Sequence, residues 1–123
     1  MSSCRGFGEI DTHGDLNRGG VFFKIIPRSD DAIKIYEIDV ITKERNHTGL
    51  VEEIWNIRSD GEKLNEFQYG ILPKGFFEKT KASNLKIDTM YIVSANGTMM
   101  MGSFRASSCF YIDNAKMAKY VDC

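Results

Sequence analysis

Short apolar runs separated by polar, turn-forming residues make up most of the chain. The run at residues 21–26 is rich in β-branched and aromatic side chains and is closed by Pro27. Runs of this kind are typical of β-strands. By the same pattern we expect strands over residues 33–41, 50–57 and 67–72, one that begins near residue 89, and a last one or two over residues 99–104 and 106–113.

The spacing of these runs indicates the fold class. Six or seven short strands about ten residues apart, with turns between them, are typical of an antiparallel sandwich or barrel. We therefore predict an all-β fold, a single antiparallel β-sandwich of the immunoglobulin-like type. The predicted turns lie at residues 59–62, 73–75 and 96–97, and residues 76–80 extend the preceding strand or pair at an edge.

The hydrophobic phase changes inside the second predicted strand. Ile35 and Val40 have opposite parity, whereas the side chains of a regular strand alternate between its two faces. The change predicts a β-bulge near Tyr36 and Glu37, or burial of both faces. In the next strand Glu53 shares the phase of the apolar positions, so it is either a strand-end residue or a buried carboxylate.

The two ends of the chain differ from its middle. Residues 1–20 hold five of the eleven glycines and few apolar side chains, which predicts a flexible tether before a domain of residues 21–123. Asn114 is a helix-capping residue type, and several of residues 115–119 favour helix. We expect a short C-terminal helix there if it docks on the sheet.

Composition and charge narrow the class of protein. The chain has 123 residues, of which 42% are apolar and 27% charged, so it resembles one folded domain more than a disordered protein. Its 16 Lys and Arg against 17 Asp and Glu leave a formal charge of −1, without the basic excess of a nucleic-acid binder. No apolar run approaches the roughly 18 residues of a membrane-spanning helix.

Residues with metal-binding or catalytic chemistry form no recognised motif. Asp11, His13 and Asp15 alternate, and on an extended segment they could offer a metal two oxygens and a nitrogen. The chain has only two histidines and no further ligand motif, so these three are better explained as polar residues of a glycine-rich segment. Cys109 with His47 likewise lacks the motif of a nucleophilic site. We expect a non-enzymatic protein with no metal and no cofactor.

Two clusters of consecutive apolar residues cannot be wholly buried. Because strand side chains alternate, at least one of residues 99–101, all methionine, lies outside the core. It is covered by a partner, for which methionine is well suited, or by the C-terminal segment. In the same way, one of the two rings at residues 76 and 77 points inward and the other outward. The resulting candidate partner-binding residues are Lys74, Phe76, Phe77, Asn96, Met99, Met100 and Met101, with the loop at residues 42–49 beside them.

The three cysteines leave at least one thiol outside any internal pair. Phe104 and Phe110 share one parity, so Cys109 points to the opposite face of its strand. A C-terminal segment folded across that face would bring Cys123 close to Cys109. We predict a disulfide between them, worth about 3 kcal/mol in the chain-entropy estimate. The alternative is two unpaired thiols in a reducing compartment.

The start of the chain, Met1-Ser2-Ser3-Cys4, resembles the end of a bacterial lipobox, in which small residues precede a cysteine that becomes acylated. Met1 stands where leucine is usual, and no charged or apolar signal region precedes it. The resemblance implies that Cys4 carries a lipid and that the export signal belongs to a longer precursor. The lipid is then the only membrane contact we expect.

A second resemblance rests on Trp55-x-Ile57, the stretch F-Q-Y-G-I-L-P-K-G-F at residues 67–76, Leu85, and residues 91–93. These positions look like those of small Gram-negative periplasmic lipoproteins, some of which are immunity proteins of type VI secretion systems. The motif is structural, and the likeness covers about residues 33–112. No binding residue carries over, because such surfaces differ between toxin pairs.

The family implies a membrane-anchored periplasmic protein that binds a secreted toxin and occludes its active site. One alternative is an accessory envelope lipoprotein without a toxin partner. Another is a cytosolic enzyme or small-molecule binder. The identity of the toxin and the oligomeric state stay open.

Overall fold

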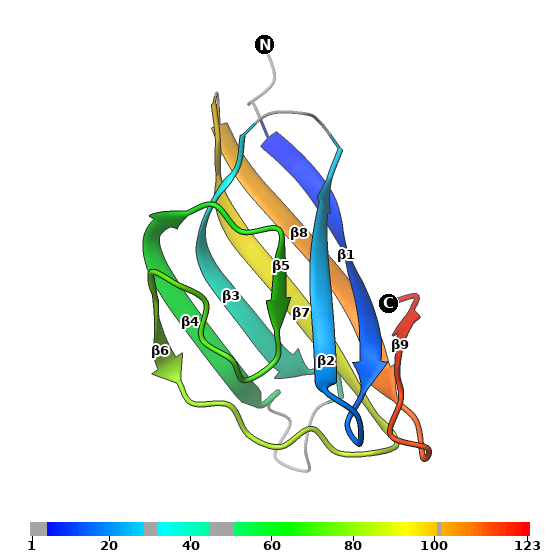
Figure 1. Ribbon diagram of the computed structural model, residues 1–123. Helices are drawn as coiled ribbons and strands as arrows, with labels where there is room; N and C mark the ends of the chain where they lie inside the picture. The colour runs from blue at the N-terminus through cyan, green and yellow to red at the C-terminus, as the bar shows by residue number, and fades with distance from the viewer. Residues whose placement is uncertain (1–4, 29–31, 45–50, 101) are drawn as a thin grey trace.

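The structure is a computed structural model that describes residues 5–28, 32–44, 51–100 and 102–123. Within these ranges the chain forms strands and no helix, so no described segment is a helix that could span a membrane. The strands are β1 (Arg5–Asp15), β2 (Gly20–Pro27), β3 (Lys34–Thr42), β4 (Glu53–Glu62), β5 (Glu66–Gln68), β6 (Phe76–Thr80), β7 (Thr89–Met99), β8 (Gly102–Ile112) and β9 (Ala118–Val121) (Figure 1).

The strands form one sheet that curls into a half-barrel (Figure 1). Its order is β5-β2-β1-β8-β7-β3-β4-β6, and β9 pairs with β8 beside this path. The all-β prediction is confirmed. The two-sheet sandwich is not confirmed, because a single curled sheet carries all the pairings. The wholly antiparallel arrangement is wrong at one place, since β1 and β8 run parallel.

An aromatic cluster fills the inside of the curl. The ring of Phe23 on β2 lies 5.0 Å from that of Phe67 and 5.3 Å from that of Phe110, measured between centroids. Trp55 on β4 lies 6.2 Å from Phe67 on β5. Side chains therefore join β5, at one end of the strand order, to β4, the strand next to the other end. The Trp55 indole is fully buried, and its Nε1 donates to Glu78 Oε2 at 3.1 Å.

The N-terminal segment is part of the sheet from Arg5 onward, so the prediction of a flexible tether over residues 1–20 is wrong for β1. Ile10 is 0% exposed, and its backbone N–H donates to Ser108 Oγ at 2.9 Å. A Cβ on Gly8 would lie 2.7 Å from the carbonyl oxygen of Ile26. Here glycine allows close packing between strands, and its abundance does not indicate flexibility.

The predicted bulge in β3 is confirmed at Tyr36. The register of β3 shifts between Ile35 and Glu37 against both β4 and β7, which leaves Tyr36 as the extra residue. On β7 the neighbouring Gly97 comes so close to β3 that a Cβ there would lie 1.9 Å from the carbonyl oxygen of Lys34. The bulge and this glycine are therefore one packing feature.

Two of the predicted turns are wrong. Asn96 and Gly97 lie inside β7, and the hairpin closes later, where Met99 pairs with Gly102. Residues 59–62 continue β4, with Gly61 at φ 112°. In both places the ladder to neighbouring strands outweighs the local preference for a turn, because β7 has partners on both sides and β4 pairs with β3 as far as Glu62.

The strand predicted over residues 67–72 is shorter in the structure, where β5 ends at Gln68. Tyr69 follows β5, and its backbone N–H still donates to the Val21 carbonyl at 2.9 Å. Its ring packs on Trp55, with centroids 5.1 Å apart, and its hydroxyl lies 3.3 Å from the carbonyl oxygen of Ile54. The predicted turn before β6 is confirmed by a 3.1 Å hydrogen bond from the Phe76 N–H to the Pro73 carbonyl. At the end of the strand order, β6 is an edge strand.

The predicted C-terminal helix is wrong, because this segment turns back as strand β9. Asp113 Oδ1 accepts hydrogen bonds from the backbone N–H groups of Ala115 at 3.0 Å and Met117 at 2.9 Å. These bonds hold a turn, after which β9 pairs antiparallel with β8 and places Val121 opposite Cys109. Backbone pairing with β8 therefore replaces the weak helical preference of a short segment.

Strand β9 brings Cys123 to Cys109. Their Sγ atoms lie 2.00 Å apart and their Cα atoms 5.3 Å apart, which fits the predicted disulfide. Cys109 is 0% exposed. The expected pair is therefore brought together, but by a strand rather than by a helix.

Candidate functional site

We call the side of β1, β8, β7, β3, β4 and β6 that points away from the core the outer face. Inward positions on the central strands, such as Ala95, Ile38 and Ile57, are 0% exposed. The outward positions stand opposite one another across the strands and form two rows. The first row is Phe7, Arg105, Asn96, Glu37, Arg58 and Phe77, and the second is Ser107, Ser94, Asp39, Asn56 and Thr80.

Exposed aromatic rings end the first row on both sides. Phe7 on β1 is 51% exposed and Phe77 on β6 is 56% exposed. They are separated by five strand spacings, which is about 24 Å along the sheet. Aromatic side chains are enriched at protein-binding surfaces.

Three carboxylates gather in the middle of the outer face, and we call Glu37, Asp39 and Glu53 the acidic cluster. The Asn56 amide links two of them, since its Nδ2 donates to Glu37 Oε2 at 2.9 Å and to Glu53 Oε2 at 3.3 Å. Arg58 Nη2 lies 3.4 Å from Glu37 Oε2. Glu53 begins β4 and is exposed, so of its two predicted alternatives the strand-end residue is confirmed.

Burial raises the pKa of Asp39 from 3.8 to about 6, and the nearby negative charges of Glu37 and Glu53 add to this effect. The guanidinium of Arg105 acts in the opposite direction and lowers it. One acid of the outer face therefore titrates close to neutral pH, where most aspartates are fully ionised.

Asn56 holds an unsatisfied polar atom beside the acidic cluster. Its side chain is 1% exposed, and its Oδ1 accepts no hydrogen bond from the described part of the chain. A buried amide oxygen without a donor costs about 1–3 kcal/mol. Among the same residues the Nε of Arg58, two positions along β4, is also buried and unpartnered.

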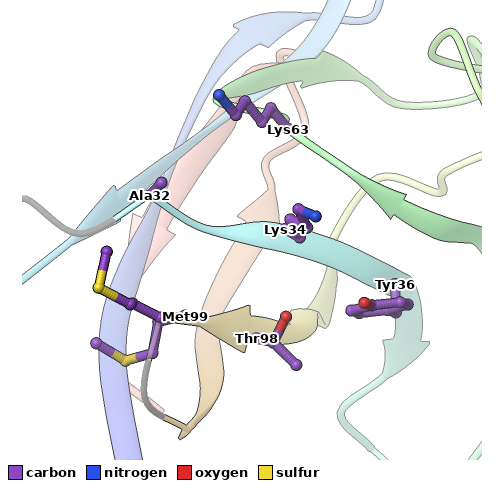
Figure 2. A pocket seen from close by; sticks show the side chains of 7 residues that line it. Ala32, Lys34, Tyr36, Lys63, Thr98 and Met99 are labelled. Carbon is purple, nitrogen blue, oxygen red and sulfur yellow. The ribbon is translucent and has the colours of Figure 1, made fainter.

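A groove of about 300 Å³ lies at the hairpin end of the outer face (Figure 2). Figure 2 shows Lys34 at the start of β3, Lys63 just after the end of β4, and Met99 at the end of β7 around it. Met100 in the hairpin is 82% exposed. The residues that line the groove are Ala32, Lys34, Tyr36, Lys63, Thr98, Met99 and Met100.

The structure places the predicted partner-binding residues in four situations. Asn96 and Phe77 share the first row of the outer face, and Met99 and Met100 line the groove at its end. Lys74 is exposed in the turn before β6. Phe76 is 7% exposed and belongs to the core, so its assignment to the binding surface is wrong. The prediction that only one of the two rings is buried is confirmed.

The other predicted positions add no described residue to the two rows of the outer face or to the groove. Met101, Cys4, His47 and most of the loop at residues 42–49 lie outside the described residues. His13 stacks on Phe22 with ring centroids 5.6 Å apart. Within the described ranges no three His, Cys, Asp or Glu side chains are placed to hold a metal ion.

Sequence reasoning missed the acidic cluster and its neighbours. The signal was present, because Glu37 alternates with Asp39 on β3 and Asn56 alternates with Arg58 on β4. Alternation alone puts each pair on one face. Only the register, which sets Asp39 opposite Asn56 and Glu37 opposite Arg58, brings the two pairs together.

Comparison with protein-family models, with curated proteins and with solved structures gives no match for this chain.

Proposed function

We propose that this chain is a non-enzymatic binding protein and that the outer face of its sheet docks a protein partner. The observation that carries the proposal is the exposure of large apolar side chains on and beside a polar sheet face. Phe7 and Phe77 are more than half exposed, and Met100 in the hairpin is 82% exposed. Aromatic residues and methionine are enriched at such interfaces.

In this proposal the outer face is formed before the partner binds. The strands behind the outer face are held by the aromatic core, so the rows of side chains keep their spacing without a partner. Interfaces of this kind bind with little backbone movement. The methionine hairpin supplies the adaptable part, because a thioether chain can repack against differently shaped surfaces.

We further propose that the partner is a secreted antibacterial toxin and that this protein is a periplasmic immunity lipoprotein anchored through Cys4. The resemblance of residues 67–76 and of the first four residues to such proteins supports this. The short distance between Cys109 and Cys123 also supports it, because disulfides persist in oxidising compartments such as the periplasm. Binding would protect the cell by covering the toxin's active site.

The test is titration calorimetry with the product of the neighbouring gene as the candidate toxin. We expect wild type to bind and Phe77→Ala to bind at least about ten-fold more weakly, since buried aromatic anchors carry much of an interface's energy. Tyr120→Ala is the matched control. Tyr120 is 52% exposed but stands opposite the inward-facing Phe110, so its loss should change affinity less than about two-fold.

Two other results would contradict parts of the proposal. Equal weakening by Phe77→Ala and Tyr120→Ala would show that binding does not use the outer face. Absence of binding to the neighbouring product would favour an accessory envelope lipoprotein over an immunity protein. Membrane fractionation of cells that export the protein, with and without Cys4→Ser, tests the anchor separately, and we expect the variant in the soluble fraction.

A further inference from the structure

The acidic cluster at the centre of the outer face consists almost entirely of hydrogen-bond acceptors. Ionised carboxylates only accept, and so does an amide oxygen. Asn56 and Arg58 both donate to Oε2 of Glu37, which leaves Oε1 of that carboxylate for another donor. Thr80 Oγ1 and Asn56 Nδ2 reach Glu53.

The cations around the cluster do not balance its charge. Arg58 contacts Glu37 at 3.4 Å, which is long for a charge-assisted hydrogen bond. Arg105 on β8 acts on Asp39 by its charge. The charged groups that act on Asp39 are thus Glu37 on its own strand, Glu53 on β4 and Arg105 on β8, while Arg58 on β4 pairs with Glu37. Together with Asp39 itself, the carboxylates outnumber the guanidinium groups.

A buried acceptor belongs to the side chain that joins two of these carboxylates. Asn56 is 1% exposed and its amide contacts both Glu37 and Glu53, yet its Oδ1 has no donor in the described part of the chain. The cluster is still open to solvent, since the side chains of Glu37 and Arg58 are 32% and 42% exposed. A ligand that displaces Glu37 slightly would reach the amide.

We propose that the acidic cluster, with Asn56, binds one arginine side chain of the protein partner. The inference rests on the proposed function and names the partner group that the outer face recognises. A guanidinium brings five N–H donors in a planar fork and a permanent positive charge. The acceptors belong to adjacent strands about 4.8 Å apart, a spread that a fork covers better than the single point of an ammonium group.

The position of the cluster fits this role. It lies between Phe7 and Phe77, so a docked partner would exclude water from it. Arginine is among the residues most enriched at the centres of interfaces. A metal ion is the weaker alternative, because no three potential ligands in the described ranges are placed to hold one.

The experiment uses small probes on the whole chain, without a partner. N-acetyl-arginine amide is titrated into the protein while carboxyl signals are followed by NMR. N-acetyl-citrulline amide, which has the same shape but no charge, is the matched probe, and N-acetyl-lysine amide separates guanidinium from ammonium. We expect the arginine probe to bind at least ten-fold more tightly than the citrulline probe, and more tightly than the lysine probe.

Binding also has a signature at Asp39. A cation beside it should lower its pKa from about 6 towards 3.8, and affinity should fall as the pH drops below 6. Asp39→Asn and Glu37→Gln, both isosteric, should each weaken arginine binding several-fold. Glu66→Gln on the edge strand β5 should leave it unchanged, because Glu66 is exposed away from the outer face.

The outcomes separate this inference from the proposed function. Equal affinity for the arginine and citrulline probes, or an unmoved pKa of Asp39, overturns the arginine site even if a toxin binds through Phe77. Tighter binding of the lysine probe would show that the site prefers an ammonium group to a guanidinium, and would overturn the arginine site. Arginine binding that Asp39→Asn and Glu37→Gln both weaken supports the site even if no toxin partner is found.

Discussion

The two faces of β3 and β4 carry residues of opposite character. Ile38 and Ile57 face each other inside the curl and are 0% exposed. One residue away, Glu37 and Arg58 face each other outside as a partly exposed ion pair. The sheet therefore separates two roles by side-chain parity. The inner face supplies the apolar burial that stabilises the fold, and the outer face of β3 and β4 carries the polar residues of the candidate site.

The largest effect that tests this separation is expected from Trp55→Ala on the inner face. Trp55 is fully buried and contacts the rings of Phe67 and Tyr69. Its removal leaves a cavity and should lower the free energy of unfolding by about 3–5 kcal/mol in denaturant titration. Trp55→Phe keeps a ring and should cost less. A loss below about 1 kcal/mol for the alanine variant would contradict the inner face as the source of stability.

The next largest effect is expected from Cys123→Ser, because the disulfide joins an outward-facing residue and still stabilises the fold. Cys109 points outward, and the disulfide holds β9 against β8. Opening it should lower the unfolding free energy by about 3 kcal/mol. A reductant should destabilise wild type by the same amount and leave the variant unchanged. Alkylation of three thiols in the oxidised protein would show that no bond exists.

A smaller effect follows from the pKa of Asp39. This acid has a folded pKa of about 6 against 3.8 in the unfolded chain, so the folded state holds its proton more tightly. Stability from this group is therefore lost as the pH rises from about 4 to about 6 and stays lost above that.

Asp39→Asn tests this sign. After allowance for solvent screening we expect a gain of about 1 kcal/mol at pH 7 and a flatter stability profile between pH 4 and 6. Thermal unfolding at a series of pH values measures both. Glu66→Gln is the control on β5 and should leave the profile as in wild type. A destabilised Asp39→Asn at pH 7 would contradict the raised pKa.

The inner face was largely predictable from the sequence, because its signal is local. The β-branched and aromatic run of β2 and the phase change at Tyr36 are visible within a few residues, and both elements are confirmed. The strands that pair with β1 and β9 were not predictable in this way. Gly8 suggested flexibility because β8, the strand it packs beside, lies far away in the sequence. Residues 115–119 suggested helix because local propensity does not reveal the pairing of β9 with β8.

The outer face was predictable only in part, for the same reason. Consecutive phenylalanines and methionines require an exposed member, and Phe77 and Met100 are indeed exposed. Which of the two rings turns inward depends on how β6 registers with β4. The acidic cluster depends on register altogether, since Asp39 and Asn56 are seventeen positions apart in the sequence and become neighbours only through pairing.

The smallest expected effect is the contribution of the outer ion pair to the free energy of unfolding. A double-mutant cycle of Glu37→Gln and Arg58→Gln isolates their coupling energy. With side chains 32% and 42% exposed, the coupling should be about 0.2–1 kcal/mol and should fall further in high salt. The same cycle with Ile38→Ala and Ile57→Ala serves as the reference. Each of these two substitutions, at the inward neighbours of Glu37 and Arg58, should lower the free energy of unfolding by more than either outer substitution does. A coupling of several kcal/mol between Glu37 and Arg58 would mean that the outer face also holds the fold together, and its residues could then not be varied freely for recognition.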